Sequence, residues 1–147
     1  MAEGILRSLL PPELRDQVEV RSAGTGAGDG MPATELAVST AKSRGIDLQR
    51  HRSVPLTKTW IEQSDLILCM ELPHVARALE LDPHAADRIH LITEQSAEGT
   101  EAATAGIRDP LGGTETEYDD TFNRIRSHLL RWLPSIREAV ERRQGVR

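Results

Sequence analysis

Apolar side chains recur at helical spacing at the very start of the chain. Those within residues 2–10 fall on one stripe, and the pair Pro11-Pro12 ends the predicted helix. Residues 18–23 instead alternate between apolar and polar side chains and run into a cluster of glycines, which predicts a short strand followed by a loop. A second helix is predicted from Pro32, which suits a first helical turn, to a stop at Gly45.

The middle of the chain contains the clearest strand. Residues 65–70 form a nearly continuous apolar run, which is typical of a parallel strand buried on both faces. Residues 56–63 have room for a turn or two of helix before it. Pro73 then begins a helix that runs through Leu81, and residues 89–92 predict a further strand. Because helices and strands alternate, the pattern predicts an α/β sandwich with a parallel sheet.

The last third of the chain is a long connection followed by one long helix. Residues 93–106 are rich in Ala, Glu, Thr and Gly and predict a surface loop, and Asp109-Pro110-Leu111-Gly112-Gly113 predicts a tight turn. From about Glu115 apolar residues recur three or four apart, so the final helix is expected to bury one face.

The predicted elements include more helices than strands. The first helix has no strand in front of it, although open α/β sheets bind ligands at the loop that joins a strand to its following helix. We therefore expect that a first strand and its loop are missing from this chain.

The composition narrows the possible functions. The chain has 147 residues, which predicts one domain, and its net charge of −5 with only four aromatic residues argues against binding to nucleic acid. One cysteine forms no internal disulfide, which fits the cytoplasm, and no spacing of Cys and His predicts a metal site, so we expect neither metal nor cofactor. No apolar run reaches the ~20 residues of a membrane span and no signal peptide is recognisable, so no membrane association is expected.

Several short segments carry recognisable motifs. They are Met1-Ala2-Glu3-Gly4-Ile5-Leu6; Ser22-Ala23-Gly24-Thr25 with Gly45-Ile46-Asp47 and His51-Arg52; residues 65–70; and Ile107-Arg108-Asp109-Pro110-Leu111-Gly112-Gly113 followed by Tyr118. In this order they resemble the low-molecular-weight protein tyrosine phosphatases, a cytosolic family that also includes arginine phosphatases and arsenate reductases. The resemblance implies a flavodoxin-like three-layer α/β/α sandwich. It also implies that residues 1–147 are a single domain whose first, central strand is missing.

The chemistry of that family needs a cysteine thiolate at a helix N-terminus, where backbone N–H groups and an arginine bind phosphate and lower the thiol pKa. Family members carry this loop as Cys, five residues, then Arg, directly before the first helix. The loop is absent here because the chain begins at Met1. Cys69 does not replace it, since Val75 stands where the arginine would be, and its apolar neighbours predict an inert core thiol.

Asp109 is the candidate catalytic residue. The resemblance implies a general acid that protonates the leaving oxygen and then activates water against the phosphoenzyme. Without the resemblance, the same residues indicate only a turn, because Asp and Gly favour turns.

Ser22 and His51 are candidate supporting residues. They resemble family residues whose hydrogen bonds hold the phosphate loop in shape. Taken alone, Ser22 is a hydroxyl at a strand end and His51 a solvated loop histidine. Leu111 departs from the many relatives that carry an aromatic residue at this place, so a preference for phosphotyrosine does not follow.

Two hypotheses of different classes result. In the first, the protein is a phosphatase that acts on phosphorylated proteins or small phosphate esters, its reading frame starts at an internal methionine, and residues 1–147 are inactive alone. In the second, the protein is a non-catalytic relative that binds a partner or completes its sheet with a strand of another chain. Arsenate reduction by thiol relay would need further cysteines, which the chain lacks.

Overall fold

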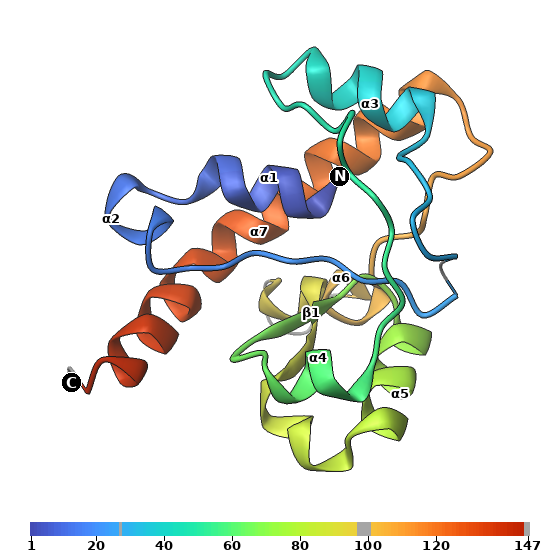
Figure 1. The fold of residues 1–147 in the computed structure, drawn as a ribbon. Coiled ribbons are helices and arrows are strands. Elements are labelled where there is room, and N and C mark those ends of the chain that lie inside the picture. The colour runs from blue at the N-terminus through green and yellow to red at the C-terminus, as the bar shows by residue number, and fades with distance from the viewer. Residues whose placement is uncertain (27, 97–100, 146–147) are drawn as a thin grey trace. The chain divides into compact units, whose positions relative to one another are not determined.

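The computed structural model describes residues 1–26, 28–96 and 101–145 (Figure 1). The chain divides into two compact units, each made of two stretches of sequence. Unit 1 comprises Met1–Pro55 with Arg108–Ser127, and unit 2 comprises Leu56–Ile107 with His128–Arg147. Among the described residues, no helix combines the length and the apolar character that crossing a bilayer requires.

Unit 1 begins with the predicted amphipathic helix. Helix α1 spans Ala2–Leu9, and Leu10 leaves it in an extended conformation before the two prolines. The second proline opens a short helix, α2 (Pro12–Arg15), that the sequence did not indicate. Its formation is consistent with the general rule that proline tolerates the first helical turn, where its missing N–H has no partner to lose.

The second helix begins three residues later than predicted. Helix α3 spans Glu35–Lys42, and its N-cap Thr34 accepts a hydrogen bond from the backbone N–H of Ala37 at 3.2 Å. Pro32 lies before the helix, in an antiparallel bridge with Arg52. The stop at Gly45 is confirmed, because this residue has a φ of +77°, which favours glycine.

The strand predicted at residues 18–23 is wrong. The segment alternates between more and less buried side chains as expected, yet it forms no ladder with any described residue. A strand needs a paired neighbour, and the described residues next to this segment form just one bridge, between Gly24 and Pro55. There Gly24 N–H donates to Val54 O at 2.9 Å.

Helix α7 (Glu115–Arg143) contributes its first half to unit 1. There Arg44, just after α3, forms an ion pair with Asp119 at 3.0 Å and lies over the ring of Phe122, 4.5 Å from its centroid. Thr34 and Tyr118 also share a hydrogen bond of 3.1 Å between their hydroxyl groups. These contacts fix α3 to α7.

Unit 2 is built on a parallel pair of strands. Strands β1 (Ile67–Cys69) and β2 (Ile89–Leu91) pair in parallel, with Ile67 opposite Ile89. Helix α5 (Leu72–Leu81) and the 3₁₀ helix η1 (Pro83–Arg88) connect the two strands, and α4 (Lys58–Glu62) precedes β1. The predicted strands and the helix between them are therefore confirmed, and the sheet is parallel as expected for an α/β fold.

Strand β1 is less buried than its apolar sequence predicted. Only Cys69 is buried, whereas Ile67 and Leu68 are partly exposed. Among the described residues β1 pairs with β2 alone, so one edge of the strand has no neighbour in the sheet. A strand is buried on both faces only where helices cover both, and the partial exposure of Ile67 and Leu68 shows that this cover is incomplete here.

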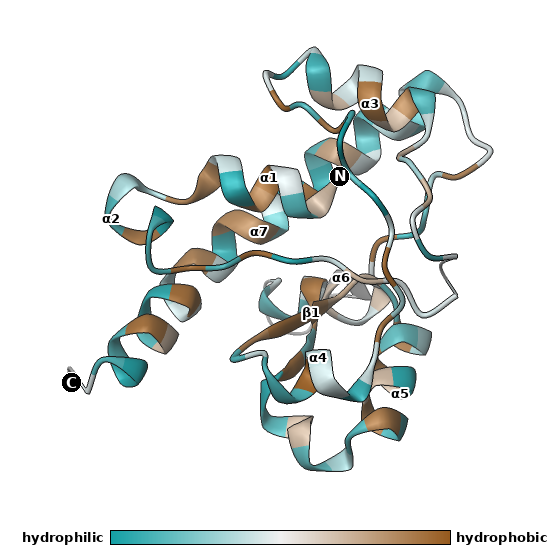
Figure 2. Cartoon of the chain, in the orientation of Figure 1, coloured by the Kyte–Doolittle hydropathy of each residue, from teal (hydrophilic) through white to brown (hydrophobic). Residues whose placement is uncertain are grey.

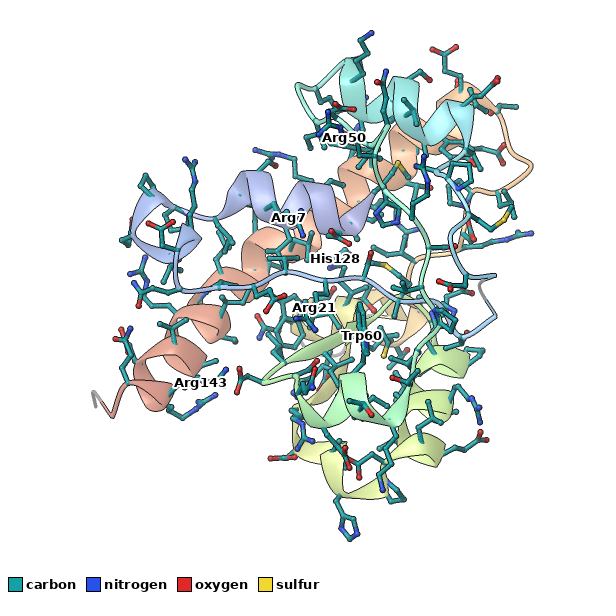
Figure 3. The ribbon with its side chains drawn as sticks, viewed as in Figure 1. Arg7, Arg21, Arg50, Trp60, His128 and Arg143 are labelled. Carbon is teal, nitrogen blue, oxygen red and sulfur yellow. The ribbon has the colours of Figure 1, made fainter. Side chains whose placement is uncertain are left out.

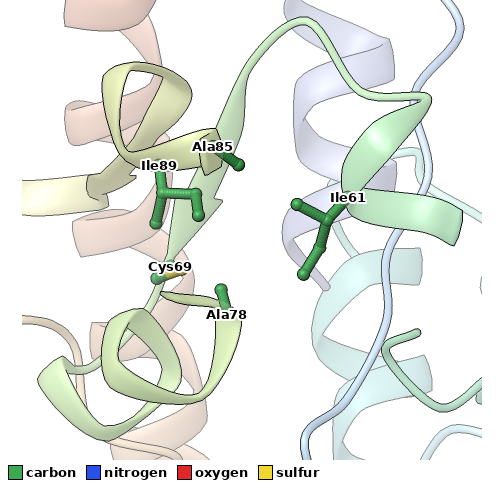
Figure 4. Packing of buried hydrophobic residues seen from close by; sticks show 5 residues of the cluster. All are labelled: Ile61, Cys69, Ala78, Ala85 and Ile89. Atoms are coloured by element: carbon green, nitrogen blue, oxygen red, sulfur yellow. The ribbon is translucent and has the colours of Figure 1, made fainter. Parts of the chain in front are cut away.

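The core of unit 2 forms where α4 and α5 meet the strands. Ile61, Cys69, Ala78, Ala85 and Ile89 pack together there (Figure 4). Cys69 is the only cysteine of the chain, and burial raises the pKa of its thiol to about 11. The expectation of an inert core thiol agrees with this environment.

The connection at residues 93–106 is more ordered than the predicted surface loop. A 3₁₀ helix, η2 (Ile92–Gln95), and a short helix, α6 (Glu101–Ala105), lie within it, and residues 97–100 fall outside the described part. The prediction missed that Thr93 is fully buried. Its hydroxyl donates to Ala103 O at 3.1 Å and accepts from Gly106 N–H at 3.2 Å, so one side chain satisfies both backbone groups.

The second half of α7 packs within unit 2. Trp132 is buried, its indole N–H donates to Ile92 O at 2.7 Å, and its ring lies 5.2 Å from that of His90. Along α7, brown apolar residues recur between teal polar ones (Figure 2). The predicted helix with one apolar face is thus confirmed.

Substituting Gly106 tests how tightly this connection is held. Gly106 has a φ of +68°, and a Cβ atom there would lie 2.5 Å from Met70 O. The left-handed conformation costs an L residue about 1–2 kcal/mol, and with the clash we expect Gly106→Ala to lower the free energy of unfolding by about 2–4 kcal/mol. Urea unfolding measures this loss.

Gly45→Ala is the matched control, because Gly45 has a φ of +77° and open space around its Cα. It should cost only the conformational part, about 1–2 kcal/mol. Equal losses in the two variants would show that the approach to Met70 carries no penalty.

The reactivity of Cys69 is a second test. Because the thiol pKa is about 11, only about one thiol in a thousand is ionised at pH 8. Iodoacetamide should therefore label the folded chain slowly at pH 8, and about tenfold faster for each pH unit towards 11. Mass spectrometry follows the labelling, with the urea-unfolded chain as control. Rapid labelling of the folded chain at pH 8 would contradict the burial described here.

Candidate functional site

Glu3, in the first turn of α1, gathers polar side chains around it. Its carboxylate is 18% exposed, and one oxygen accepts a hydrogen bond from the hydroxyl of Ser22 at 2.5 Å. The same oxygen lies 3.8 Å from Nδ1 of His51. The other oxygen pairs with the guanidinium of Arg7 at 2.9 Å, one helical turn along α1. Both predicted supporting residues, Ser22 and His51, therefore meet on one carboxylate.

Arg7, which is labelled in Figure 3, holds the segment that contains Ser22. Its guanidinium also donates to Val20 O at 2.8 Å, so a single side chain connects α1 with residues 18–23. In an extended chain, residues two apart point to the same side. Val20 is buried in unit 1, and the hydroxyl of Ser22 is directed towards Glu3.

The loop around His51 is held mainly through its backbone. His51 N–H donates to Leu48 O at 3.1 Å, and Leu48 is buried. The guanidinium of Arg52 donates to Gln49 O at 3.0 Å and to His51 O at 2.7 Å. These bonds hold the loop in which the imidazole of His51 approaches Glu3.

Asp109 lies on the predicted turn, which is confirmed. One oxygen of its carboxylate accepts from Leu111 N–H at 2.9 Å, Gly113 N–H donates to Pro110 O at 2.8 Å, and Gly112 has a φ of +79°. The carboxyl group is exposed to solvent.

The amino group of Met1 connects Asp109 with the residues around Glu3. Burial lowers the pKa of this amino group, whereas the carboxylates of Glu3 and Asp109 act in the opposite direction. Asp109 therefore lies close enough to the N-terminal end of α1 to act on a charge there. Asp109, Glu3, Ser22 and His51 all belong to unit 1.

Helix α7 begins directly after the Asp109 turn with a reciprocal cap. Thr114 N–H donates to the carboxylate of Glu117 at 2.6 Å, and Glu117 N–H donates to the hydroxyl of Thr114 at 3.3 Å. The backbone hydrogen bond from Thr114 is the main cause that lowers the pKa of Glu117. This cap fixes where the turn ends.

The residues around the N-terminal end of α1 provide groups that can attract an anion and groups that can donate or accept a proton. The N-terminal end of a helix attracts anions through its free N–H groups and its dipole. Beside it lie an exposed carboxyl group, a hydroxyl and an imidazole. No cluster of three or more His, Cys, Asp or Glu residues able to hold a metal occurs within the described ranges. Cys69 is not part of this group, because it lies in the core of unit 2.

Two residues of the site were not predicted from the sequence. Glu3 and Arg7 were assigned no role, although Glu3 is the residue on which Ser22 and His51 converge. A signal was present, because an acid and a base four residues apart in an otherwise apolar first helix indicate a pair. The contacts with residues 22 and 51 had no such signal.

Comparisons with known proteins identify the family of this chain. The family described as low molecular weight phosphotyrosine protein phosphatase matches residues 1–143. A probable low molecular weight protein-tyrosine-phosphatase, EpsP of Ralstonia nicotianae, is 30% identical over 137 residues, which cover 93% of this chain and 86% of that protein. A protein-arginine-phosphatase of Geobacillus stearothermophilus is 35% identical over 101 residues, covering 69% of this chain and 65% of that protein.

Solved structures show the same relationship. The tyrosine phosphatase AmsI of Erwinia amylovora superposes with a TM-score of 0.77 at 25% identity, over 91% of this chain and 82% of that one. The YwlE arginine phosphatase of Geobacillus stearothermophilus gives 0.77 at 29% identity, over 93% and 83%. The sequence match over nearly all of the chain and the α/β fold lead to one assignment: the chain belongs to the low molecular weight phosphotyrosine protein phosphatase family.

Proposed function

We propose that this chain supplies the general acid of a site that hydrolyses phosphoric monoesters on phosphorylated proteins or small esters. The reaction passes through a cysteinyl-phosphate intermediate. The observation that supports this most is that Ser22 and His51 both approach the carboxylate of Glu3 in the first turn of α1, where Asp109 and Glu3 both act electrostatically on the amino group of Met1. The expected place of action is the cytoplasm, in keeping with a single, unpaired cysteine.

Asp109 acts as the acid and then as the base in this proposal. When the bond between phosphorus and the leaving oxygen breaks, the carboxylic acid of Asp109 gives its proton to that oxygen. The resulting carboxylate then takes a proton from the water that attacks the phosphoenzyme, which releases phosphate. Asp109 is suited to both steps because it is exposed on a turn that Gly112 and Pro110 keep tight.

Ser22, His51 and Glu3 serve as positioning residues. The Glu3 carboxylate accepts from Ser22 and lies near His51, so the three side chains hold each other beside the first turn of α1. Polar groups fixed in this way place a phosphate-binding segment without rearrangement during the reaction.

The nucleophile is the part that residues 1–147 do not hold. Cys69 is their only cysteine, it is not followed by the Cys-x5-Arg spacing, and its raised pKa keeps it as a neutral thiol. We therefore propose that hydrolysis requires a thiolate and an arginine supplied from outside these 147 residues. A second role, binding of a phosphorylated partner without hydrolysis, is favoured by the same observation.

The 147-residue chain alone is expected to hydrolyse no aryl phosphate by a cysteine mechanism. Release of p-nitrophenol from p-nitrophenyl phosphate measures this, with Cys69→Ser as the matched variant. Turnover that disappears in Cys69→Ser would overturn the proposal, because Cys69 would then be the nucleophile.

Asp109 can be tested once a nucleophile is present. When a strand and a Cys-x5-Arg segment are joined ahead of Met1, we expect phosphatase activity, and Asp109→Ala should lower kcat about 100-fold because the leaving oxygen loses its proton donor. Asp120→Ala is the control, since Asp120 is an exposed acid on α7 in the same unit. An unchanged kcat in Asp109→Ala would remove Asp109 from the mechanism.

The mass of the protein isolated from its native source separates the two roles. A mass well above 16.2 kDa, with a peptide that carries Cys-x5-Arg ahead of Met1, would support hydrolysis. A mass of 16.2 kDa would instead favour the binding role.

A further inference from the structure

Positive side chains flank the candidate site although the chain as a whole is acidic. Arg50 and Arg52 stand on either side of His51, and Arg108 directly precedes Asp109. All three side chains are exposed, and Arg50 is labelled in Figure 3. The net charge of the whole chain is −5. Bulk attraction of anions is therefore excluded, and any attraction here is local.

These arginines are not neutralised by carboxylates in the way that others in unit 1 are. Arg7, Arg21 and Arg44 form ion pairs with Glu3, Glu19 and Asp119. By contrast, no hydrogen bond or ion pair connects the guanidinium of Arg50 with any residue that the structure describes.

The other two flanking arginines form no ion pair with a described carboxylate. Arg52 donates only to backbone carbonyls, of Gln49 and His51. Arg108 has an electrostatic interaction with Glu117 and no ion pair within the described part of the chain.

The chain places Arg50 and Arg108 next to residues of the site. His51 approaches Glu3 at 3.8 Å, and Asp109 acts with Glu3 on the amino group of Met1. Neighbouring Cα atoms are about 3.8 Å apart, so Arg50 and Arg108 each begin one residue from a group of the site. The positive end of the α1 dipole adds to the same field.

We infer that Arg50 and Arg108 bind carboxylate groups next to the phosphate ester, so that the favoured substrate is a phosphorylated peptide segment with Asp or Glu beside the phosphorylated residue. This inference rests on the proposed function and names its substrate class. A guanidinium binds a carboxylate through two parallel hydrogen bonds, which gives such a contact both strength and direction.

The test compares two phosphotyrosine peptides that differ only in their flanking residues, Asp and Glu in one and Asn and Gln in the other. The protein titrated is the chain with a strand and a Cys-x5-Arg segment joined ahead of Met1, its added cysteine replaced by serine so that the peptides are not hydrolysed. Backbone NMR signals followed during the titration give both affinities. We expect the acidic peptide to bind about tenfold more tightly at low salt, and this ratio to shrink as salt screens the charges.

Variants then assign the preference to residues. The double variant Arg50→Gln with Arg108→Gln should bring the ratio of the two affinities close to one. Arg126→Gln is the matched control, because Arg126 is an exposed arginine of unit 1 that has no ion pair with described residues and does not adjoin the site. It should leave the ratio unchanged.

The outcomes separate this inference from the proposed function. Equal affinities in the unsubstituted chain, or a preference that survives in the double variant, would overturn the inference alone. Signals of Ser22, His51 and Asp109 that respond no more to the phosphorylated peptides than to unphosphorylated ones would contradict the proposed function. Failure of both peptides to bind would count against both. Tight binding of the unphosphorylated acidic peptide would point to a general polyanion surface and would also overturn the inference.

Discussion

The carboxylate of Glu3 is the group on which the site depends. It sits in the first turn of α1, accepts from Ser22, faces His51 and pairs with Arg7. Arg7 in turn donates to Val20 O, so a segment that joins no ladder with any described residue is held to α1 by the same side chain that pairs with Glu3. The side chain of Glu3 is less exposed than those of Arg7 and His51, and the loss of its carboxylate removes three interactions at once.

Cys69 and Asp109 lie in opposite environments, one buried and one exposed, and this difference determines whether each side chain can react. Cys69 lies among apolar side chains, which keep its thiol protonated and inert. Asp109 lies on an exposed turn near the N-terminal end of α1, where its carboxyl group is open to water. In residues 1–147 the carboxyl group of Asp109 is therefore accessible to solvent, whereas their only thiol is buried in the core of unit 2.

Most elements that depend on interactions between residues close in sequence could be predicted from the sequence. The run at residues 65–70, the helix after it and the turn at Asp109 follow from apolar patterning, proline and glycine, which act within a few residues. The strand expected at residues 18–23 failed because a strand depends on a partner elsewhere in the chain. The buried Thr93 and the role of Glu3 were missed for the same reason, since their partners lie ten or more residues away. Placing Ser22 and His51 near each other required the family resemblance.

Ser53 gives the glycine-rich loop after residue 24 a property of its own. Its backbone exchanges hydrogen bonds with Gly30 and Met31 at 2.8 Å each, and its hydroxyl donates to Gly28 O and accepts from Met31 N–H. All of these bonds reach backbone groups of the loop. The loop conformation is thus specified from outside, by a serine on a neighbouring segment. Because these bonds use no side chain of the loop, substitutions at its described positions leave the bonds in place as long as the serine is kept. Gly30 is the exception, since its φ of +74° favours glycine.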